Sequence, residues 1–300
     1  MEWLADDELA QKIEDLPRYP LGVRADDEVR LSLGGVQEKL LLTRAPDGRL
    51  GQPKNGAPST HILKPGRGEY PDIVANEAFC LLVAHFVGLP VPKVEVIDVA
   101  GSPCLLVERF DRHVTDDGGI ERVHQEDTCQ ALRRLPSEKY ESEGGPSIAE
   151  IINLLRDIGG STTARDIRGL LMVTVLNLLL GNCDAHGKNY ALLHEPKKGI
   201  SLAPFYDIVS TNVYPQLTDK LAMTVGGTSK PEEITARSWA KLAEESGLGR
   251  QLLSQVEGNI RLIVKTVDAA LFMASEMGWY RPVLEEIIAL CKKRALALTR

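Results

Sequence analysis

The apolar segment 170–180, LLMVTVLNLLL, limits how this chain of 300 residues can fold more than any other stretch. Because apolar residues lie on almost every side of it, we predict a buried helix that ends at Gly181. The segment is too short to cross a bilayer, which takes roughly 20 residues. The polar loop 181–189, GNCDAHGKN, follows it directly. Charged and amide side chains therefore emerge from rigid structure, which is typical of a site of chemistry.

The composition is ordinary for a soluble protein and has an acidic balance. Apolar residues make up 43% of the chain, charged residues make up 26%, and the formal net charge is -7. Such a surface repels phosphate backbones and disfavours direct nucleic-acid binding. The 5 cysteines form no C-x-x-C pair, so neither a disulfide framework nor a zinc site is predicted. With an acidic start and no apolar signal segment, the sequence predicts a cytoplasmic protein without a membrane segment.

The pattern of the chain changes near Phe110. Before it, β-like runs flank Gly34 and Gly35, a short strand covers 61–64, and two more strands flank the turn AGS around one helix. After residue 112 the chain is first polar and loop-like, and then helices are predicted at 148–158, 164–180, 238–245, 252–277 and 282–298. We therefore predict an α+β fold. Residues 1–110 form a small antiparallel β lobe, and residues 111–300 form a larger helical lobe.

Two predicted strands after the polar loop bring oxygen ligands together. Segments 190–194 and 200–206 are predicted to form a hairpin centred near residue 198. In that register Asn189 faces Asp207, and facing Cα atoms lie about 4.5–5.5 Å apart. An amide oxygen and a carboxylate placed this way, next to Asp184, suit Mg²⁺.

The spacing from Asp184 to Asn189 matches the protein-kinase catalytic loop, in which an Asp precedes a metal-binding Asn by five positions. In that loop the Asp accepts a hydroxyl proton while the Asn holds a metal on the phosphates. The pattern alone recurs by chance, and the alternative is an Asp and an Asn that satisfy loop backbone. The buried helix before it and the hairpin to Asp207 after it favour phosphoryl transfer. His186 and Lys188 are either part of this site or ordinary loop residues.

Two features of the first lobe fit a nucleotide. Gly34 and Gly35 allow backbone N–H groups to approach phosphates, although a plain hairpin turn gives the same pattern. Lys64 shares a strand face with Ile62 and needs an anionic partner, either a phosphate or Glu77 on an apolar helical row. A Lys64–Glu77 ion pair places the lysine for phosphates, as in kinases. Two independent surface charges are the alternative.

Several motifs follow one another through roughly residues 30 to 225: SLGGVQEKLLL, THILKP, NEAFC, LLVERFDR, HQEDTCQ, KYESEGGPSI, GNCDAHGKN, LAPFYDIVS and KLAM. Together they resemble the HipA family, which are bacterial toxin serine/threonine kinases with a two-lobed, protein-kinase-like fold that use ATP and Mg²⁺. Asp207 is followed by Ile-Val and not by the Phe-Gly of eukaryotic kinases, so a flip of that kind is not expected.

The resemblance implies a role for each candidate residue. Asp184 is implied to be the catalytic base, Asn189 and Asp207 the Mg²⁺ ligands, and Lys64 the phosphate-anchoring lysine. Ser32 is implied to be the autophosphorylated serine that switches the kinase off. Contacts to ATP are implied for Gly34, Gly35, Val36, Gln37, Glu38, Lys39, Lys64, Glu108, Arg109, Phe110, His186, Gly187, Lys188, Asn189, Tyr206 and Asp207, with Glu108, Arg109 and Phe110 as the hinge that meets adenine.

The resemblance also implies partners. Family members phosphorylate an aminoacyl-tRNA synthetase and are inhibited by a helix-turn-helix antitoxin that binds operator DNA. DNA contact would then be mostly the partner's, in keeping with the net charge of -7. Full-length members carry a larger N-terminal subdomain than the segment that precedes Ser32 here, so we expect either a separate small protein in its place or a truncated chain. The alternatives are a small-molecule kinase of the aminoglycoside type and a non-catalytic nucleotide- or antitoxin-binding module.

Overall fold

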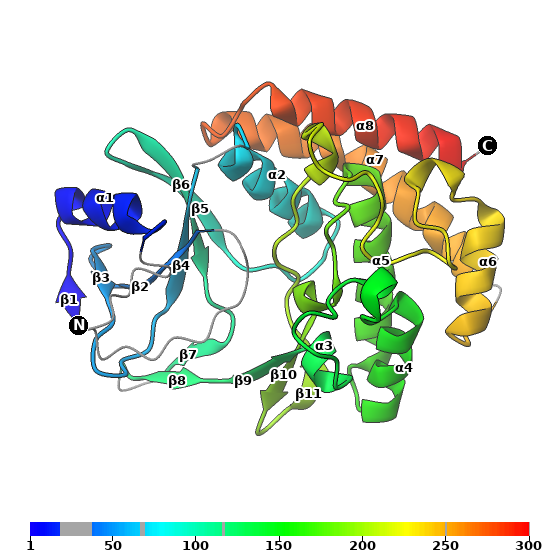
Figure 1. Ribbon diagram of the computed structural model, residues 1–300, viewed down its shortest axis with the longest axis horizontal. Helices are drawn as coiled ribbons and strands as arrows, with labels where there is room; N and C mark the ends of the chain where they lie inside the picture. The colour runs from blue at the N-terminus through cyan, green and yellow to red at the C-terminus, as the bar shows by residue number, and fades with distance from the viewer. Residues whose placement is uncertain (19–37, 67–69, 116–117, 250, 300) are drawn as a thin grey trace. The chain divides into compact units, whose positions relative to one another are not determined.

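The computed structural model describes residues 1–18, 38–66, 70–115, 118–249 and 251–299 (Figure 1). The chain divides into two compact units. Unit 1 comprises Met1–Val74 and Pro92–Val123, and unit 2 comprises Ala75–Val91 and His124–Arg300. The border therefore follows Val123, whereas the sequence places it near Phe110. Helix α2, Ile73–Phe86, belongs mostly to unit 2 and not to the first lobe.

A six-stranded antiparallel sheet forms the centre of unit 1, with the order β1-β3-β2-β4-β6-β5. Its strands are β1 Glu2–Trp3, β2 Leu40–Arg44, β3 Leu50–Gln52, β4 His61–Pro65, β5 Val94–Val99 and β6 Ser102–Glu108. The predicted strand at 61–64 and the predicted hairpin around AGS are confirmed. In that hairpin Ala100 and Gly101 have φ values of 51° and 82°, and Asp98 Oδ1 accepts the Gly101 N–H at 2.8 Å.

Helix α1, Asp6–Asp15, covers one face of this sheet and is not among the elements that the sequence analysis predicts. Its buried side chains pack with apolar residues of the strands, in a cluster of Leu9, Ile13, Leu16, Leu40, Leu42, Leu63, Val99, Cys104 and Leu106. The signal is the spacing of Leu9, Ile13 and Leu16 together with Glu8, whose Oε2 accepts the Ala5 N–H at 2.8 Å. The sequence analysis predicts a single helix in the β lobe and therefore misses α1.

A short hairpin forms where the sequence predicts a polar loop. Strands β7, Arg112–Val114, and β8, Ile120–Arg122, pair antiparallel. Each strand has three residues, of which two are exposed, and the only apolar ones in the pair are Val114 and Ile120, so no alternation of apolar and polar residues marks them as strands.

Unit 2 is mainly helical. Besides α2 it contains α3 Thr128–Ala131, α4 Ile148–Ile158, α5 Thr163–Leu180, α6 Ala236–Glu245, α7 Gln251–Glu276 and α8 Val283–Leu298. The five helices predicted after residue 112 are confirmed within two residues at each end. A three-stranded antiparallel sheet, ordered β11-β10-β9, joins them, with β9 His124–Asp127, β10 Ala191–Glu195 and β11 Gly199–Leu202.

The buried helix that the sequence predicts is α5. Its residues from Leu170 to Leu180 are almost all buried, and α5 packs against α4, α7 and α8. Gly181 ends it in the left-handed conformation, at φ 81°, and donates its N–H to Asn177 O at 3.0 Å. None of the helices in the described part of the chain is both long and apolar enough to cross a membrane.

Candidate active site

The loop after α5 is tied to its surroundings through its backbone. The Cys183 N–H donates to Thr211 Oγ1 at 2.9 Å, and Thr128 Oγ1 donates to Gly187 O at 2.6 Å. Gly187 has no room for a side chain, because a Cβ there would lie 2.7 Å from Pro146 Cδ and 2.8 Å from Cys129 Sγ. The loop therefore presents Asp184 and Asn189 from a fixed backbone.

Asn189 and Asp207 are in contact, as the sequence predicts. Asn189 Nδ2 donates to Asp207 Oδ2 at 3.0 Å, and Asn189 Oδ1 accepts the His186 N–H at 3.0 Å. Asn189 ends the short 3₁₀ helix η2, Gly187–Asn189, and is 9% exposed.

The predicted register behind this contact is wrong. Leu192 pairs with Leu202 and Glu195 with Gly199, so the hairpin is centred at residue 197 and not at 198. Every residue of β10 therefore pairs with a residue two positions earlier in the sequence than predicted, and Asp207 lies beyond the end of β11. Asp207 reaches Asn189 instead from an irregular segment, in which its own φ is 60°, a left-handed conformation.

Asp184 is exposed, and its carboxylate binds one tyrosine. Tyr140 donates its hydroxyl to Asp184 Oδ1 at 2.8 Å. Burial, and secondly this hydrogen bond, raise the pKa of Tyr140, so its hydroxyl is protonated and acts as a donor at neutral pH. Within the described residues no donor contacts Asp184 Oδ2. One oxygen of the candidate base is therefore occupied while the other is open.

His186 lies beside Tyr140, edge-on, with ring centroids 5.4 Å apart. Burial lowers the pKa of His186, although the charge of Asp184 opposes the shift, so the ring is neutral at pH 7. Its Nδ1 is buried without a hydrogen-bond partner among the described residues. Lys188 donates from Nζ to Pro136 O at 2.8 Å, and Tyr206 donates its hydroxyl to Lys188 O at 2.7 Å.

The segment that carries Asp207 is held by a buried amide that the sequence analysis does not identify. Asn76 on α2 donates from Nδ2 to Ser210 O at 2.9 Å and accepts the Ser210 N–H at Oδ1 at 2.8 Å. Arg294 on α8 adds a hydrogen bond from Nη2 to Asn212 Oδ1 at 2.9 Å. The one available signal for Asn76 is its position on an otherwise apolar helix, where a buried amide must find partners.

The candidate nucleotide residues of unit 1 are only partly within the described chain. Ser32, Gly34, Gly35, Val36 and Gln37 lie outside the described residues, whereas Glu38 and Lys39 precede β2.

Lys64 lies on β4, opposite Leu105 of β6, and shares its half-buried face with Ile62 as predicted. The fully buried core that α1 covers lies on the opposite face, where Leu63 points. Ile62 is therefore not part of that core. Lys64 belongs to unit 1 and Glu77 to unit 2, so their ion pair stays a prediction.

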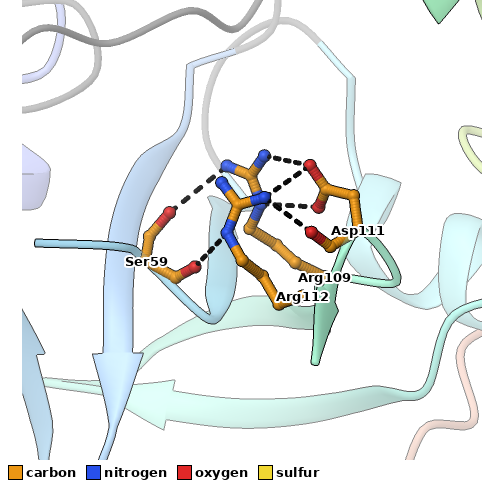
Figure 2. Close-up of polar contacts among 4 residues, drawn as sticks. All are labelled: Ser59, Arg109, Asp111 and Arg112. Carbon is orange, nitrogen blue, oxygen red and sulfur yellow. Dashed lines mark hydrogen bonds and ion pairs between the residues drawn. The ribbon is translucent and has the colours of Figure 1, made fainter. Parts of the chain in front are cut away.

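The predicted adenine hinge runs into a buried charge cluster (Figure 2). Arg109 donates to both carboxylate oxygens of Asp111, at 3.0 Å from Nε and 2.7 Å from Nη2, and Arg112 Nη1 donates to Asp111 Oδ2 at 2.7 Å. Ser59 accepts from both arginines, through Oγ and the main-chain oxygen. Burial raises the pKa of Asp111, but the hydrogen bonds and charges of the two arginines outweigh it and leave that pKa lowered.

This cluster changes the expectation for Arg109. Its guanidinium is bound within the protein and its side chain is only 11% exposed. Its main-chain N–H donates to Thr60 O at 2.9 Å. A contact from Arg109 to a nucleotide would therefore come from its main-chain oxygen and not from its charge.

One unit contains an antiparallel sheet. In the other, helical unit an Asp, an Asn and a second Asp gather on neighbouring loops. These features define a mixed α+β fold of the protein-kinase type. The crystal structure of a Helicobacter pylori proinflammatory kinase, CtkA, has this fold, with a TM-score of 0.52 over 79% of this chain and 87% of that chain. At 12% sequence identity this likeness concerns the fold alone.

Residues 31–271 match the family described as HipA-like C-terminal domain, and the chain belongs to this kinase family. In a complex of HipA, HipB and operator DNA from Shewanella oneidensis MR-1, the similar chain has a TM-score of 0.80 and 29% identity over 99% of this chain and 70% of that chain.

Two curated relatives are similar along most of this chain. "Putative kinase Y4mE" of Sinorhizobium fredii is 42% identical over 86% of this chain and 60% of its own length. "Serine/threonine-protein kinase toxin HipA" of Shewanella oneidensis is 33% identical over 93% of this chain and 64% of its own length. The chain thus spans less than two thirds of either relative.

Proposed function

We propose that this chain is a serine/threonine protein kinase that uses ATP and Mg²⁺. The observation that carries the proposal is the contact between Asn189 and Asp207 at 3.0 Å, on the loops next to the exposed carboxylate of Asp184. A proton acceptor and two hard oxygen ligands are the groups that phosphoryl transfer needs from a protein.

The donor set fits Mg²⁺ delivered with a nucleotide. Among the described residues no group of three or more His, Cys, Asp or Glu side chains could hold a metal ion. Mg²⁺ typically takes one or two protein ligands and completes its shell with water and phosphates. The Asp207 carboxylate and the second lone pair of Asn189 Oδ1, whose first accepts the His186 N–H, would provide such a partial set. The ion, when bound, neutralises charge on the phosphates.

In the proposed reaction Asp184 accepts the proton of a serine or threonine hydroxyl as that oxygen attacks the γ-phosphorus of ATP. The bond from this phosphorus to the β–γ bridging oxygen breaks at the same time, and ADP leaves with the bridging oxygen. Lys64, paired with Glu77, binds the phosphates, and residues 34–39 cover them. Main-chain atoms of Glu108, Arg109 and Phe110 meet the adenine, and His186, Gly187, Lys188 and Tyr206 line the nucleotide site.

Regulation and partners are proposed from the family. The Shewanella protein is described in a complex with HipB and operator DNA. We extend this to a helix-turn-helix antitoxin that binds this chain in the cytoplasm and carries the DNA contact, and to an aminoacyl-tRNA synthetase as protein substrate. Autophosphorylation of Ser32 would lower ATP affinity, because a phosphate adds about -1.5 to -2 charge beside the nucleotide.

The test uses the purified chain with radiolabelled ATP and a cell lysate. We expect a labelled protein band that requires Mg²⁺ and disappears with EDTA. Asp207→Ala should abolish labelling, whereas Asp157→Ala, at an exposed acidic position of α4 outside the site, should leave it unchanged. Label found only on small molecules would assign the chain to the aminoglycoside-type kinases. Calorimetry without any Mg²⁺-dependent ATP binding would contradict catalysis altogether.

Mass spectrometry after incubation with ATP addresses Ser32 separately. We expect one phosphate on the peptide that contains Ser32, and weaker ATP binding by Ser32→Asp than by Ser32→Ala. Equal affinities of the two variants would remove the proposed switch and leave the kinase activity untouched.

A further inference from the structure

Tyr140 contacts the candidate base and has no role assigned by the proposed function. Its hydroxyl lies 2.8 Å from Asp184 Oδ1 and links two segments that are 44 residues apart in the sequence. Asp184 is exposed, and within the described chain Tyr140 is the side chain that binds its carboxylate. Tyr140 therefore contributes to the orientation of that carboxylate.

The backbone of Tyr140 is fixed. Its main-chain oxygen accepts the N–H groups of Glu143, at 2.9 Å, and Gly145, at 2.8 Å. A Cβ on Gly145 would lie 2.7 Å from the same oxygen, so the turn closes tightly around it. The next residue, Glu141, donates its N–H to Ala222 O at 3.1 Å, and the Ala222 N–H donates to Cys183 O at 2.8 Å. The tyrosine and the loop of Asp184 are thus joined through main-chain hydrogen bonds as well.

The ring of Tyr140 is also held by its neighbours. His186 packs against it edge-on at 5.4 Å, with 77° between the ring planes, and Lys139 Nζ lies 4.7 Å from the ring centroid. Both kinds of contact are attractive in this geometry and restrict the rotation of the ring. The hydroxyl is therefore presented to Asp184 by a side chain with little freedom of its own.

We propose that Tyr140 is a positioning residue for Asp184. By donating to Oδ1 it fixes the rotation of the carboxylate and leaves Oδ2 directed to the incoming hydroxyl. A general base acts only within hydrogen-bond reach of the proton it takes, and small errors in its placement reduce the rate strongly. The inference deepens the proposed kinase function and rests on it.

Tyr140→Phe tests the role because it keeps the ring and its contacts with His186 and Lys139 while it removes the donor. We expect kcat to fall about 10- to 100-fold, the size of a lost hydrogen bond to a charged group. The Kd for ATP, measured by calorimetry, should stay unchanged, because the phenylalanine ring keeps the contact with His186 and position 140 touches neither proposed metal ligand. A side chain that only supports the fold would not separate kcat from nucleotide binding in this way.

Tyr280→Phe is the matched control. Tyr280 also donates its hydroxyl to a carboxylate at 2.8 Å, that of Glu285 on α8, and it lies outside the candidate site. This variant should keep the wild-type kcat. Thermal unfolding of both variants checks that each is folded.

A double variant separates this inference from the proposed function. In an Asp184→Asn background, Tyr140→Phe should cause no further loss, because the two residues act as a unit. An active wild type with inactive Asp184→Asn and fully active Tyr140→Phe would overturn the positioning role alone. Higher kcat/KM for the protein substrate in Tyr140→Phe would overturn it too, by showing that the tyrosine blocks the hydroxyl's position. If Asp184→Asn keeps full activity, the proposed base itself is wrong.

Discussion

Aspartates are used in opposite ways in the two units. Asp111 in unit 1 is 7% exposed, and both of its carboxylate oxygens accept hydrogen bonds from arginines. Asp184 in unit 2 is exposed and, in the part of the chain that the structure describes, receives one donor, Tyr140, on one oxygen. A buried and saturated carboxylate holds the chain in place, whereas a carboxylate with an open oxygen is available to a reactant. Buried charge without partners would be unstable, so saturation at Asp111 is a structural requirement.

From this comparison we expect substitution of Asp184 to lower activity and substitution of Asp111 to lower stability. Asp184→Asn should lower the rate of phosphoryl transfer by about 10²–10⁴-fold, the usual contribution of a general base. Its free energy of unfolding, measured with urea, should stay within about 0.5 kcal/mol of wild type, as for other exposed positions. Full transfer activity in this variant would contradict the proposed difference between the two aspartates, because Asp184 would then have no chemical role.

Asp111→Asn should do the reverse and destabilise the fold. Removing one member of a buried ion pair leaves uncompensated charge and costs about 3–5 kcal/mol. Here two guanidiniums would lose their counter-charge. Urea denaturation measures the effect, and a loss below about 1 kcal/mol would show that the arginines find other partners.

Asn76→Ala should have an intermediate effect on both properties. It removes two buried hydrogen bonds to Ser210 and should cost about 1–3 kcal/mol of stability. Because Ser210 follows Asp207 by three residues, transfer activity should fall as well. Asn153→Ala removes an exposed amide that accepts from Arg156, and it serves as the control with little change in either property. Wild-type activity in Asn76→Ala would mean that Asp207 is held by other contacts.

Acid should remove the contribution of Asp111 to stability. Because its folded-state pKa is lowered from the ordinary 3.8, its stabilising contribution is present above pH 3.8 and is lost as the pH falls through the lowered value. The difference in unfolding free energy between wild type and Asp111→Asn should therefore be constant near neutrality and shrink below pH 3.8. A difference that is the same at low and neutral pH would contradict the ion-pair explanation.

The smallest effect is expected at a surface ion pair of unit 1. Arg44 Nη1 and Glu95 Oε2 lie 2.7 Å apart, with side chains 38% and 50% exposed. Glu95→Gln should cost about 0.2–1 kcal/mol, and less in high salt. A larger loss would show that exposure does not distinguish structural charges in this unit.

Local patterns in the sequence predict those elements whose structure depends mainly on residues that are close together in the chain. The apolar run that becomes α5 and the glycine that ends it are two examples, and the hairpin of β5 and β6 is a third. The pairing of β10 and β11 is predicted in kind but not in register, because a turn one residue longer or shorter changes which residues face each other.

Contacts between distant segments are the part that a single sequence does not give. Tyr140 and Asp184 are 44 residues apart, and Asn76 and Ser210 are 134 residues apart. Periodicity constrains only which residues share a face of one element, so the partner of a lone tyrosine or buried amide stays open. The same reason hides the Asp111 cluster, in which Ser59 comes from a separate loop.

The backbone at Asp207 restricts which residues the chain can accept there. With φ at 60°, the position suits glycine, asparagine and aspartate, whose short side chains tolerate a left-handed turn. Of these three only aspartate carries a negative charge. A glutamate would keep the carboxylate that the proposed metal needs and yet meet a conformational penalty. The most conservative exchange by charge is therefore not a conservative one by geometry, and aspartate alone meets both demands.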